Sequence, residues 1–226
     1  MASHRVARPF FLSTIGKKYI MGLSGLVWAG FVLTHMAGNL LMLVSPSAYN
    51  AYGHAIVSGA IIYPAEAVLI LALITHVAMA ILLTKENRAA RPQAYAMLPQ
   101  GSKRSTLASR TMAIQGSVVL AFIILHIITF KYGTYYETTV NGVVMRDLHR
   151  LVLEVFKQPL YVIWYCVALV LLGFHLSHGF GSIFQSFGIK KEAHESLIKK
   201  MSCAYAVIVA VGFLVQPLYM FLIAGK

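Results

Sequence analysis

Residues 158–186 read QPLYVIWYCVALVLLGFHLSHGFGSIFQS, a stretch of 29 residues without an Asp, Glu, Lys or Arg. A helix needs about 20 apolar residues to cross the hydrocarbon layer of a membrane. The stretch is therefore long enough to span a bilayer with some tilt, or to project from it. Because lipid offers the backbone no hydrogen-bond partners, we expect a helix here.

Working outward from this stretch, four more apolar segments have the length of a membrane span. The five predicted spans cover residues 19–44, 62–84, 109–131, 158–186 and 201–223. The composition agrees, because 58% of the 226 residues are apolar, only 12% are charged and the mean hydropathy is +0.72. A soluble domain carries about 25% charged residues. We therefore predict an all-α integral membrane bundle of five transmembrane helices, with residues 1–226 in one domain.

Lysine and arginine are distributed unevenly between the connecting segments. Fourteen of the 19 lie in the N-terminal segment, in loop 85–110 and in loop 187–200, and the other five lie between the third and fourth spans and at the C-terminus. The positive-inside rule then places the N-terminus in the cytoplasm and the C-terminus outside. Topology and anionic lipid headgroups account for the net charge of +12, so we expect no nucleic-acid partner.

Two further features exclude simple alternatives. The basic N-terminus followed by an apolar stretch has the order of a secretory signal, but residues 19–44 exceed the ~7–15 apolar residues of such a signal, so we interpret them as a retained span. Cys166 and Cys203 lie inside predicted spans and form no CxxC or CxxCH motif. They give no support for iron–sulfur ligation or for covalent haem attachment.

Five of the nine histidines lie inside predicted spans: His35, His76, His126, His175 and His178. Polar side chains at membrane depth are costly and commonly mark a functional site, although a hydrogen bond between helices explains any single one equally well. Their depths favour function. His35 and His126 fall in the outer half of the membrane, and His76 and His175 fall in the inner half. Four helices thus supply one histidine each, in two couples at two levels.

Two facing imidazoles at one depth are what a b-type haem requires, because its iron has two axial positions that neutral imidazole can fill. Zinc would need three or four ligands at one point. We therefore predict two haem b groups that carry electrons across the membrane. Gly38 and Gly179 are candidates for the backbone beside a flat macrocycle, or for ordinary helix packing. His178 lies about 60° around the helix from His175 and is left for a haem propionate, a quinone or a carbonyl.

Several fragments, in order along the chain, resemble one family of membrane subunits. They are FVLTHMAGN at 31–39, YNAY at 49–52, ASRTM at 108–112, LH at 125–126 and FHLSHGF at 174–180. Over most of residues 15–225 the chain resembles the two-haem cytochrome b subunit of succinate:quinone oxidoreductases and quinol:fumarate reductases, the type with a single five-helix anchor (also described as the succinate dehydrogenase cytochrome b subunit).

This resemblance implies a role for each histidine couple and for partner proteins. His35 and His126 would hold the distal haem, and His76 and His175 the proximal haem. A flavoprotein subunit and an iron–sulfur subunit would dock on the cytoplasmic face of a bacterial inner (plasma) membrane. The chain itself, with no dicarboxylate site, would relay electrons between the iron–sulfur subunit and a quinone, of which menaquinone is common in the family. A higher oligomer of the complex is compatible with the resemblance.

The quinone site is predicted less directly. Glu66, near the outer end of the second span, is a carboxylate that could exchange protons with quinone, or one that reaches to the membrane surface. Ser177, His178 and Lys17 are further candidates for contacts to quinone or to a haem propionate. The fourth span contains no carboxylate, which leaves proton coupling through it without support.

Two other classes of protein share part of this pattern. A two-haem cytochrome b subunit of a hydrogenase or formate dehydrogenase would have the same histidine couples and a different soluble partner. A non-haem membrane transporter usually shows inverted repeats and charged residues at mid-membrane. This chain shows no internal repeat, and its deep polar residues are histidines. A purely structural anchor would have no need of histidines paired by depth.

Overall fold

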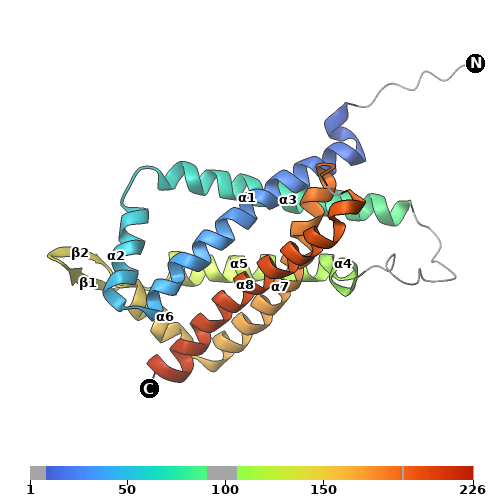
Figure 1. Cartoon of the computed structure of the whole chain (residues 1–226). Helices are drawn as coiled ribbons and strands as arrows, with labels where there is room; N and C mark the ends of the chain where they lie inside the picture. The colour runs from blue at the N-terminus through green and yellow to red at the C-terminus, as the bar shows by residue number, and fades with distance from the viewer. Residues whose placement is uncertain (1–8, 91–105, 190, 226) are drawn as a thin grey trace, which may run out of the picture.

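The computed structural model describes residues 9–90, 106–189 and 191–225, and five of its helices are long and apolar enough to cross a membrane (Figure 1). They are α1 (Thr14–Asn39), α3 (Ile62–Ala89), α5 (Met112–His126), α7 (Pro159–Ser186) and α8 (Glu195–Tyr219). Short turns extend three of them: η2 (Leu40–Leu43) after α1, η4 (Ile127–Lys131) after α5 and η6 (Met220–Ala224) after α8. The predicted all-α bundle of five membrane helices is confirmed.

Three helices extend further at one end of the bundle than the hydropathy predicts. Helix α1 begins at Thr14 rather than at residue 19, because the Ser13 hydroxyl accepts a hydrogen bond from the Gly16 N–H at 3.1 Å and caps it. Helix α3 continues five residues beyond its predicted end, and α8 begins six residues earlier. Charged residues continue these helices, and Lys17 of α1 forms an ion pair with Glu86 of α3. We call this end of the bundle the basic end.

Helix α7 lies at the centre of the packing. It packs against α8, α1 and α5, and α1 packs in turn against α3. The packing order is therefore α3, α1, α7, α5, with α8 against α1 and α7. Only 6% of the apolar window of α3, and 6% of that of α5, is buried inside the protein. Exposed apolar side chains of these two helices, such as Ile70 and Leu71 of α3 and Ile114 and Ile124 of α5, are placed to face lipid.

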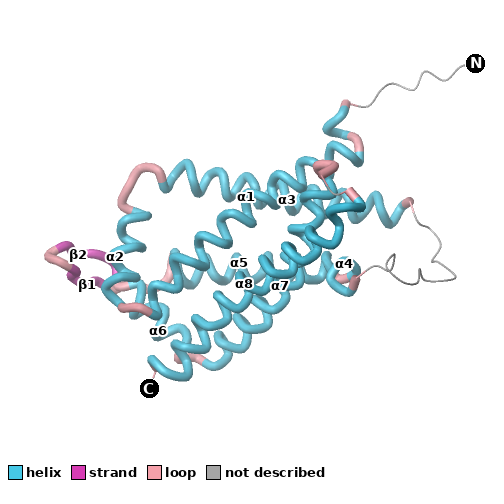
Figure 2. The backbone as a smooth tube through the Cα atoms, viewed as in Figure 1, coloured by secondary structure: helices cyan, strands magenta, loops and turns pink. Residues whose placement is uncertain are grey.

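A cap of short elements covers the other end of the bundle, which we call the capped end (Figure 1). The cap comprises α2 (Pro46–Val57), the antiparallel strands β1 (Glu137–Val140) and β2 (Val143–Arg146), and α6 (Leu148–Phe156); Figure 2 shows the two strands in magenta. The strands join at Asn141 and Gly142, whose φ values of 52° and 80° suit a type I′ hairpin turn. We expected only connecting loops here, because these elements are too short to register as membrane spans.

Buried polar contacts join α2 to α6 within the cap. Asn50 is 3% exposed, and its amide nitrogen donates to Asp147 Oδ1 at 2.8 Å. The amide oxygen of Asn50 accepts from the His149 N–H at 2.9 Å. Asp147 also caps α6 by accepting from the Arg150 N–H at 3.0 Å. The first turn of α6 is thus fixed to α2, and its apolar face packs onto the ends of the membrane helices.

Three short elements complete the basic end. The 3-10 turn η1 (Phe10–Leu12) precedes α1, and the single turn α4 (Leu107–Arg110) precedes α5. The 3-10 turn η5 (Glu192–His194) precedes α8. Part of the predicted basic segments, including Arg5, Arg8 and residues 91–105, lies outside the described residues.

Candidate functional site

Four histidines from four helices meet in two couples inside the bundle. The ring centres of His35 on α1 and His126 on α5 lie 5.7 Å apart, and we call this pair the outer couple. The ring centres of His76 on α3 and His175 on α7 lie 6.4 Å apart, and we call this pair the inner couple. The structure therefore brings together the same couples that depth along the sequence indicates.

The two couples lie at levels that are ten residues apart along three helices. On each helix one residue contacts or belongs to the inner couple, and another contacts or belongs to the outer couple. These positions are Gly25 and His35 on α1, Gly116 and His126 on α5, and His175 and Tyr165 on α7. At 1.5 Å per residue this separation is about 15 Å along the bundle. On α3, the residue ten positions from His76 is Glu66.

The ring separations fit two imidazoles on one metal ion. With a metal–nitrogen bond of about 2 Å and a nitrogen about 1.1 Å from the ring centre, two imidazoles on opposite sides of one metal ion would have centres about 6.2 Å apart. The inner couple, at 6.4 Å, has this separation, and the outer couple, at 5.7 Å, is slightly closer. Within the described residues, no group of three or more His, Cys, Asp and Glu side chains is placed to hold a metal ion. Each couple thus offers two imidazole rings at one level.

Small residues allow the inner rings to approach the neighbouring helices. A methyl group built on Gly25 of α1 would lie 3.3 Å from His76 Cε1, and one built on Gly116 of α5 would lie 3.5 Å from His175 Cε1. Each inner imidazole thus rests edge-on against a glycine. Any larger side chain at Gly25 would have to displace the ring.

The glycines beside the rings are a different pair from Gly38 and Gly179, for which the sequence left a macrocycle or ordinary helix packing open. Gly38 packs against Tyr52 of the cap, where a methyl group would overlap the tyrosine ring. The space beside Gly179 is open, with no described heavy atom within 4 Å of a methyl group built there. Proximity in sequence pointed to Gly38 and Gly179, whereas the rings contact glycines on other helices. Sequence alone gives no register between helices.

Hydrogen bonds fix the ring of His76 and leave one buried nitrogen of the inner couple free. The Ser24 hydroxyl lies 3.2 Å from His76 Nδ1. Nδ1 of His175 is buried and has no hydrogen-bond partner among the described residues. A buried polar atom without a partner is costly, so its presence at this position needs a functional reason.

An aromatic shell surrounds the outer couple. The Phe31 ring stacks on His35 with centres 5.1 Å apart and an interplanar angle of 16°. Phe122 and Phe130 pack on His126 at 5.7 and 5.3 Å. The π-helical turn η4 starts directly after His126, and such turns are frequent at functional sites. These rings surround the outer couple with apolar surface.

Each outer histidine also bonds to a polar side chain. Tyr165 Oη lies 3.2 Å from His126 Nδ1. The Asn39 amide nitrogen donates to the His35 backbone carbonyl at 3.0 Å and faces His35 Nε2 at 3.1 Å. Because a carbonyl can only accept, the nitrogen of the amide must face His35, so Nε2 accepts from Asn39 and its lone pair points at that amide.

The capped end holds Asn39 in this orientation. The Tyr49 hydroxyl, on α2, donates to Asn39 Oδ1 at 2.8 Å. Burial raises the pKa of Tyr49 well above its ordinary value, so this hydroxyl stays protonated and remains a donor. Tyr49 and Tyr165 belong to the same buried cluster as Phe156 of α6. The outer couple is therefore built into the core of the cap.

The other residues that the sequence singled out lie at several places. Lys17 pairs with Glu86 at the basic end, and Glu66 pairs with Lys131 near the capped end. The Ser177 hydroxyl donates to the Phe174 carbonyl of its own helix at 2.8 Å. His178 Nε2 lies 3.3 Å from Ser182 Oγ, also on α7. None of these contacts joins the two couples.

Sequence reasoning missed two tryptophans near the couples. The indole N–H groups of Trp28 and Trp164 are buried and have no acceptor among the described residues. Trp28 is three residues beyond Gly25 on α1, and Trp164 is adjacent to Tyr165 on α7. A carboxylate or carbonyl oxygen of a bound group is the kind of acceptor that would satisfy them. Only the structure shows that these indoles lack partners.

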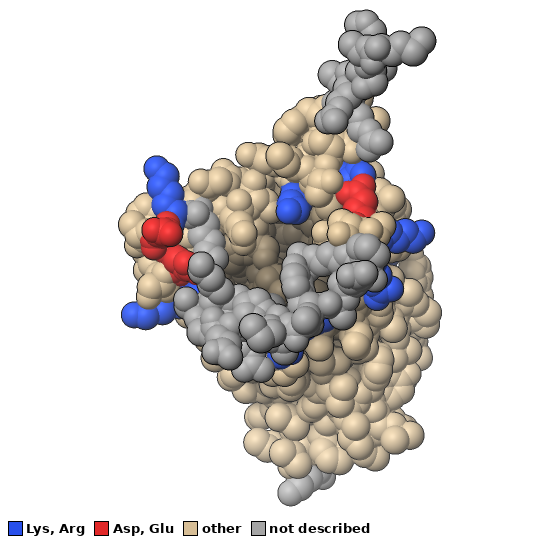
Figure 3. Space-filling model, turned by 90° about the vertical axis from the view of Figure 1, so that its right-hand side faces the viewer, with Lys and Arg blue, Asp and Glu red and all other residues tan. Residues whose placement is uncertain are grey.

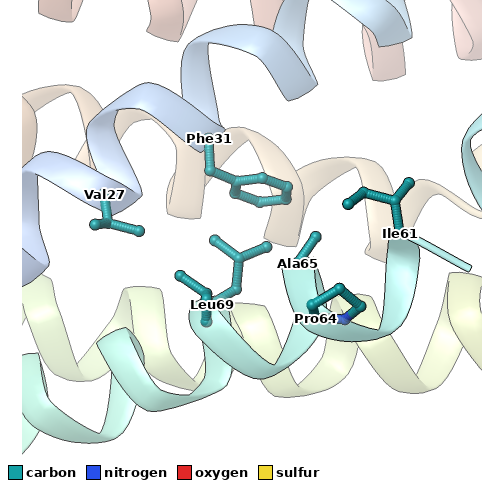
Figure 4. Close-up of a pocket in the computed structure, with 7 residues that line it drawn as sticks. Val27, Phe31, Ile61, Pro64, Ala65 and Leu69 are labelled. Carbon is teal, nitrogen blue, oxygen red and sulfur yellow. The ribbon is translucent and has the colours of Figure 1, made fainter.

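A groove of about 430 Å³ lies between α1 and α3 on the side of the outer couple (Figure 4). Its walls are apolar side chains of both helices: Val27, Phe31, Ile61, Pro64, Ala65, Val68 and Leu69. Phe31, which lines this groove, is the residue that stacks on His35. The groove thus adjoins the outer couple from the lipid side.

Comparison of the chain with family models, with curated proteins and with solved structures finds no match.

Proposed function

We propose that this chain is the two-haem cytochrome b membrane subunit of a succinate:quinone oxidoreductase or quinol:fumarate reductase. The observation that carries the proposal is the arrangement of four histidines from four helices as two facing couples, about 15 Å apart along the bundle. A structural anchor would not need this arrangement. A transporter would not need paired imidazoles at two depths.

The four histidines would hold the two haems, His35 with His126 and His76 with His175. A haem held by these histidines would supply one-electron transfer between ferric and ferrous iron. Nε2 of His35 would have to release the Asn39 amide to bind the metal, whereas Ser24 and Tyr165 would orient His76 and His126 through their Nδ1 atoms. Such bonds to ligand histidines fix ring orientation and tune basicity.

The basic end is where we place the soluble partners. Figure 3 views this end and shows lysines and arginines around a hollowed centre. An iron–sulfur subunit bound there, together with its flavoprotein subunit, would lie next to the inner couple, which is the closer couple to this end. The positive-inside rule supports a cytoplasmic location for the same end.

The outer couple is where we place quinone, for which menaquinone is our first candidate. The apolar groove beside Phe31 offers a surface for an isoprenoid chain within the membrane. Glu66, held by Lys131, is the carboxylate of α3 near the outer level and would exchange protons with the quinone. The ion pair between Glu66 and Lys131 of η4, the turn that follows α5, also joins α3 to the end of α5 at this level.

A reduced-minus-oxidised visible spectrum of the purified chain tests the haem assignment. We expect two b-type haems per chain. His76→Ala or His175→Ala should remove the inner haem only, and His35→Ala or His126→Ala the outer haem only. His194→Ala, outside the spans, is the control and should keep both. A ligand variant that retained both haems at full stoichiometry would rule out that assignment.

Two further measurements test the partner and the quinone. Co-purification with a flavin-containing subunit and an iron–sulfur subunit would separate the succinate enzyme from other quinone-linked cytochromes. Glu66→Gln should slow quinone turnover at least tenfold while haem content stays unchanged, as expected for loss of a proton-transfer group. Glu154→Gln, which removes an exposed carboxylate of the cap, is the matched control. Equal turnover in the two variants would remove Glu66 from the site.

A further inference from the structure

A serine and a glycine of α1 together enclose the ring of His76. Ser24 is 6% exposed, and its hydroxyl lies 3.2 Å from His76 Nδ1. The next residue, Gly25, brings the α1 backbone so close that a methyl group there would lie 3.3 Å from His76 Cε1. The two residues contact the side of the imidazole that carries Nδ1 and Cε1, which leaves Nε2 directed away from α1.

The direction of the hydrogen bond follows from the single proton of the serine hydroxyl. Ser24 Oγ donates that proton to the Met21 carbonyl at 3.1 Å. It can therefore only accept from His76, so Nδ1 carries the imidazole proton. In this tautomer Nε2 keeps its lone pair.

We infer that Ser24 and Gly25 form a positioning element that sets the tautomer and orientation of His76, so that its Nε2 is the metal-binding nitrogen of the inner couple. This inference rests on the proposed haem-binding function and assigns a role to residues that the ligand set does not include. The facing ligand, His175, has no such partner on Nδ1 within the part of the chain that the structure describes. His76 is therefore the more basic ligand of the couple, and α1 determines this basicity although it supplies no ligand at the inner level.

The effect on the inner haem has a defined sign. An acceptor on Nδ1–H raises the electron density on the ligating nitrogen, which favours ferric over ferrous iron. Loss of the Ser24 acceptor should therefore raise the midpoint potential of the inner haem. Outer-shell partners of this kind change metal affinity by about 10–100-fold. A tenfold change in the ferric-to-ferrous preference corresponds to about 59 mV for one electron.

The test is spectropotentiometry of the purified, haem-loaded full chain. Ser24→Ala should raise the midpoint potential of the inner haem by about 59 mV, for a tenfold change, and leave the outer haem unchanged. Ser24→Thr keeps a hydroxyl and should restore the wild-type potential. Ser117→Ala removes a hydroxyl that bonds only within α5 at 2.9 Å, and it should change neither haem.

The outcomes separate this inference from the proposed function. Absence of haem from the wild-type chain would overturn the proposed function. Two haems in the wild type, with an inner potential in Ser24→Ala equal to that of Ser117→Ala, would overturn this inference alone. If Ser24→Ala lost both haems, the same measurement would be made on Ser24→Cys, which keeps the side-chain size and weakens the hydrogen-bond acceptor. A raised midpoint potential of the inner haem in Ser24→Cys would support the inference. An unchanged potential would refute it.

Discussion

Under the proposed function, Tyr165→Phe should weaken the outer haem site selectively. The substitution removes the hydroxyl that lies 3.2 Å from His126 Nδ1 and keeps the ring. The ring packs against Phe122 at 4.8 Å and Phe156 at 4.9 Å, so these contacts remain. Loss of a hydrogen bond to a ligand histidine costs about 10–100-fold in affinity, which is about 1.4–2.7 kcal/mol. We expect partial occupancy of the outer haem and full occupancy of the inner haem.

The assay is haem content from difference spectra during titration of the purified chain with haem. Tyr205→Phe is a matched control, because Tyr205 Oη donates to the Ala29 carbonyl at 2.6 Å and contacts no histidine. Both variants lose one tyrosine hydrogen bond, which costs about 0.5–1.5 kcal/mol of folding stability. Only Tyr165→Phe should lower affinity for the second haem. Equal binding curves for the two variants would refute a role for Tyr165 at the outer ligand.

Three other predictions follow from contacts of the site and the cap. Gly25→Leu should displace His76 and reduce the haem content to one per chain. Gly30→Leu is the control and should keep two haems, because no described atom lies within 4 Å of a methyl group built there. Two haems in both variants would argue against the close contact of Gly25 with His76. Asn50→Leu should lower the free energy of unfolding in detergent by about 1–3 kcal/mol, because it leaves buried groups of α2 and α6 unpaired; an unchanged thermal midpoint would contradict this. Burial lowers the pKa of His149 despite the nearby Asp147, so the folded state binds this proton less readily than the unfolded chain. Stability should therefore fall as the pH drops through the unfolded value of about 6.5, and the slope should decrease in His149→Gln.

The sequence predicts the membrane helices and the histidine couples for related physical reasons. Long apolar runs determine the spans, and depth along each run follows from counting residues. Counting therefore places His35 with His126 and His76 with His175 without knowledge of helix packing. The extended helix starts, such as Thr14, lie outside this reasoning because they depend on caps and ion pairs rather than on hydropathy.

The surroundings of the couples depend on contacts between helices, which the sequence does not give. Gly25 and Ser24 are separated from His76 by about fifty residues, and only the packing of α1 on α3 brings them together. The cap was missed for a similar reason. Asn50 gains its role from Asp147 and His149 in a distant segment, and no local pattern marks that pairing. Local periodicity defines elements, whereas tertiary contacts define the neighbours of each ligand.

The two ends of the bundle differ in a way that bears on how a quinone would reach the outer couple. The cap closes the axial route from water, because α2 and α6 pack over the helix ends and Tyr49 extends their core to Asn39 beside His35. The groove beside Phe31 opens sideways, between α1 and α3, where apolar side chains face lipid. A quinone is apolar and resides in the membrane, so the lateral route suits it. Under the proposed function, substitutions that fill the groove should impair quinone turnover, whereas those on the outer face of the cap should not.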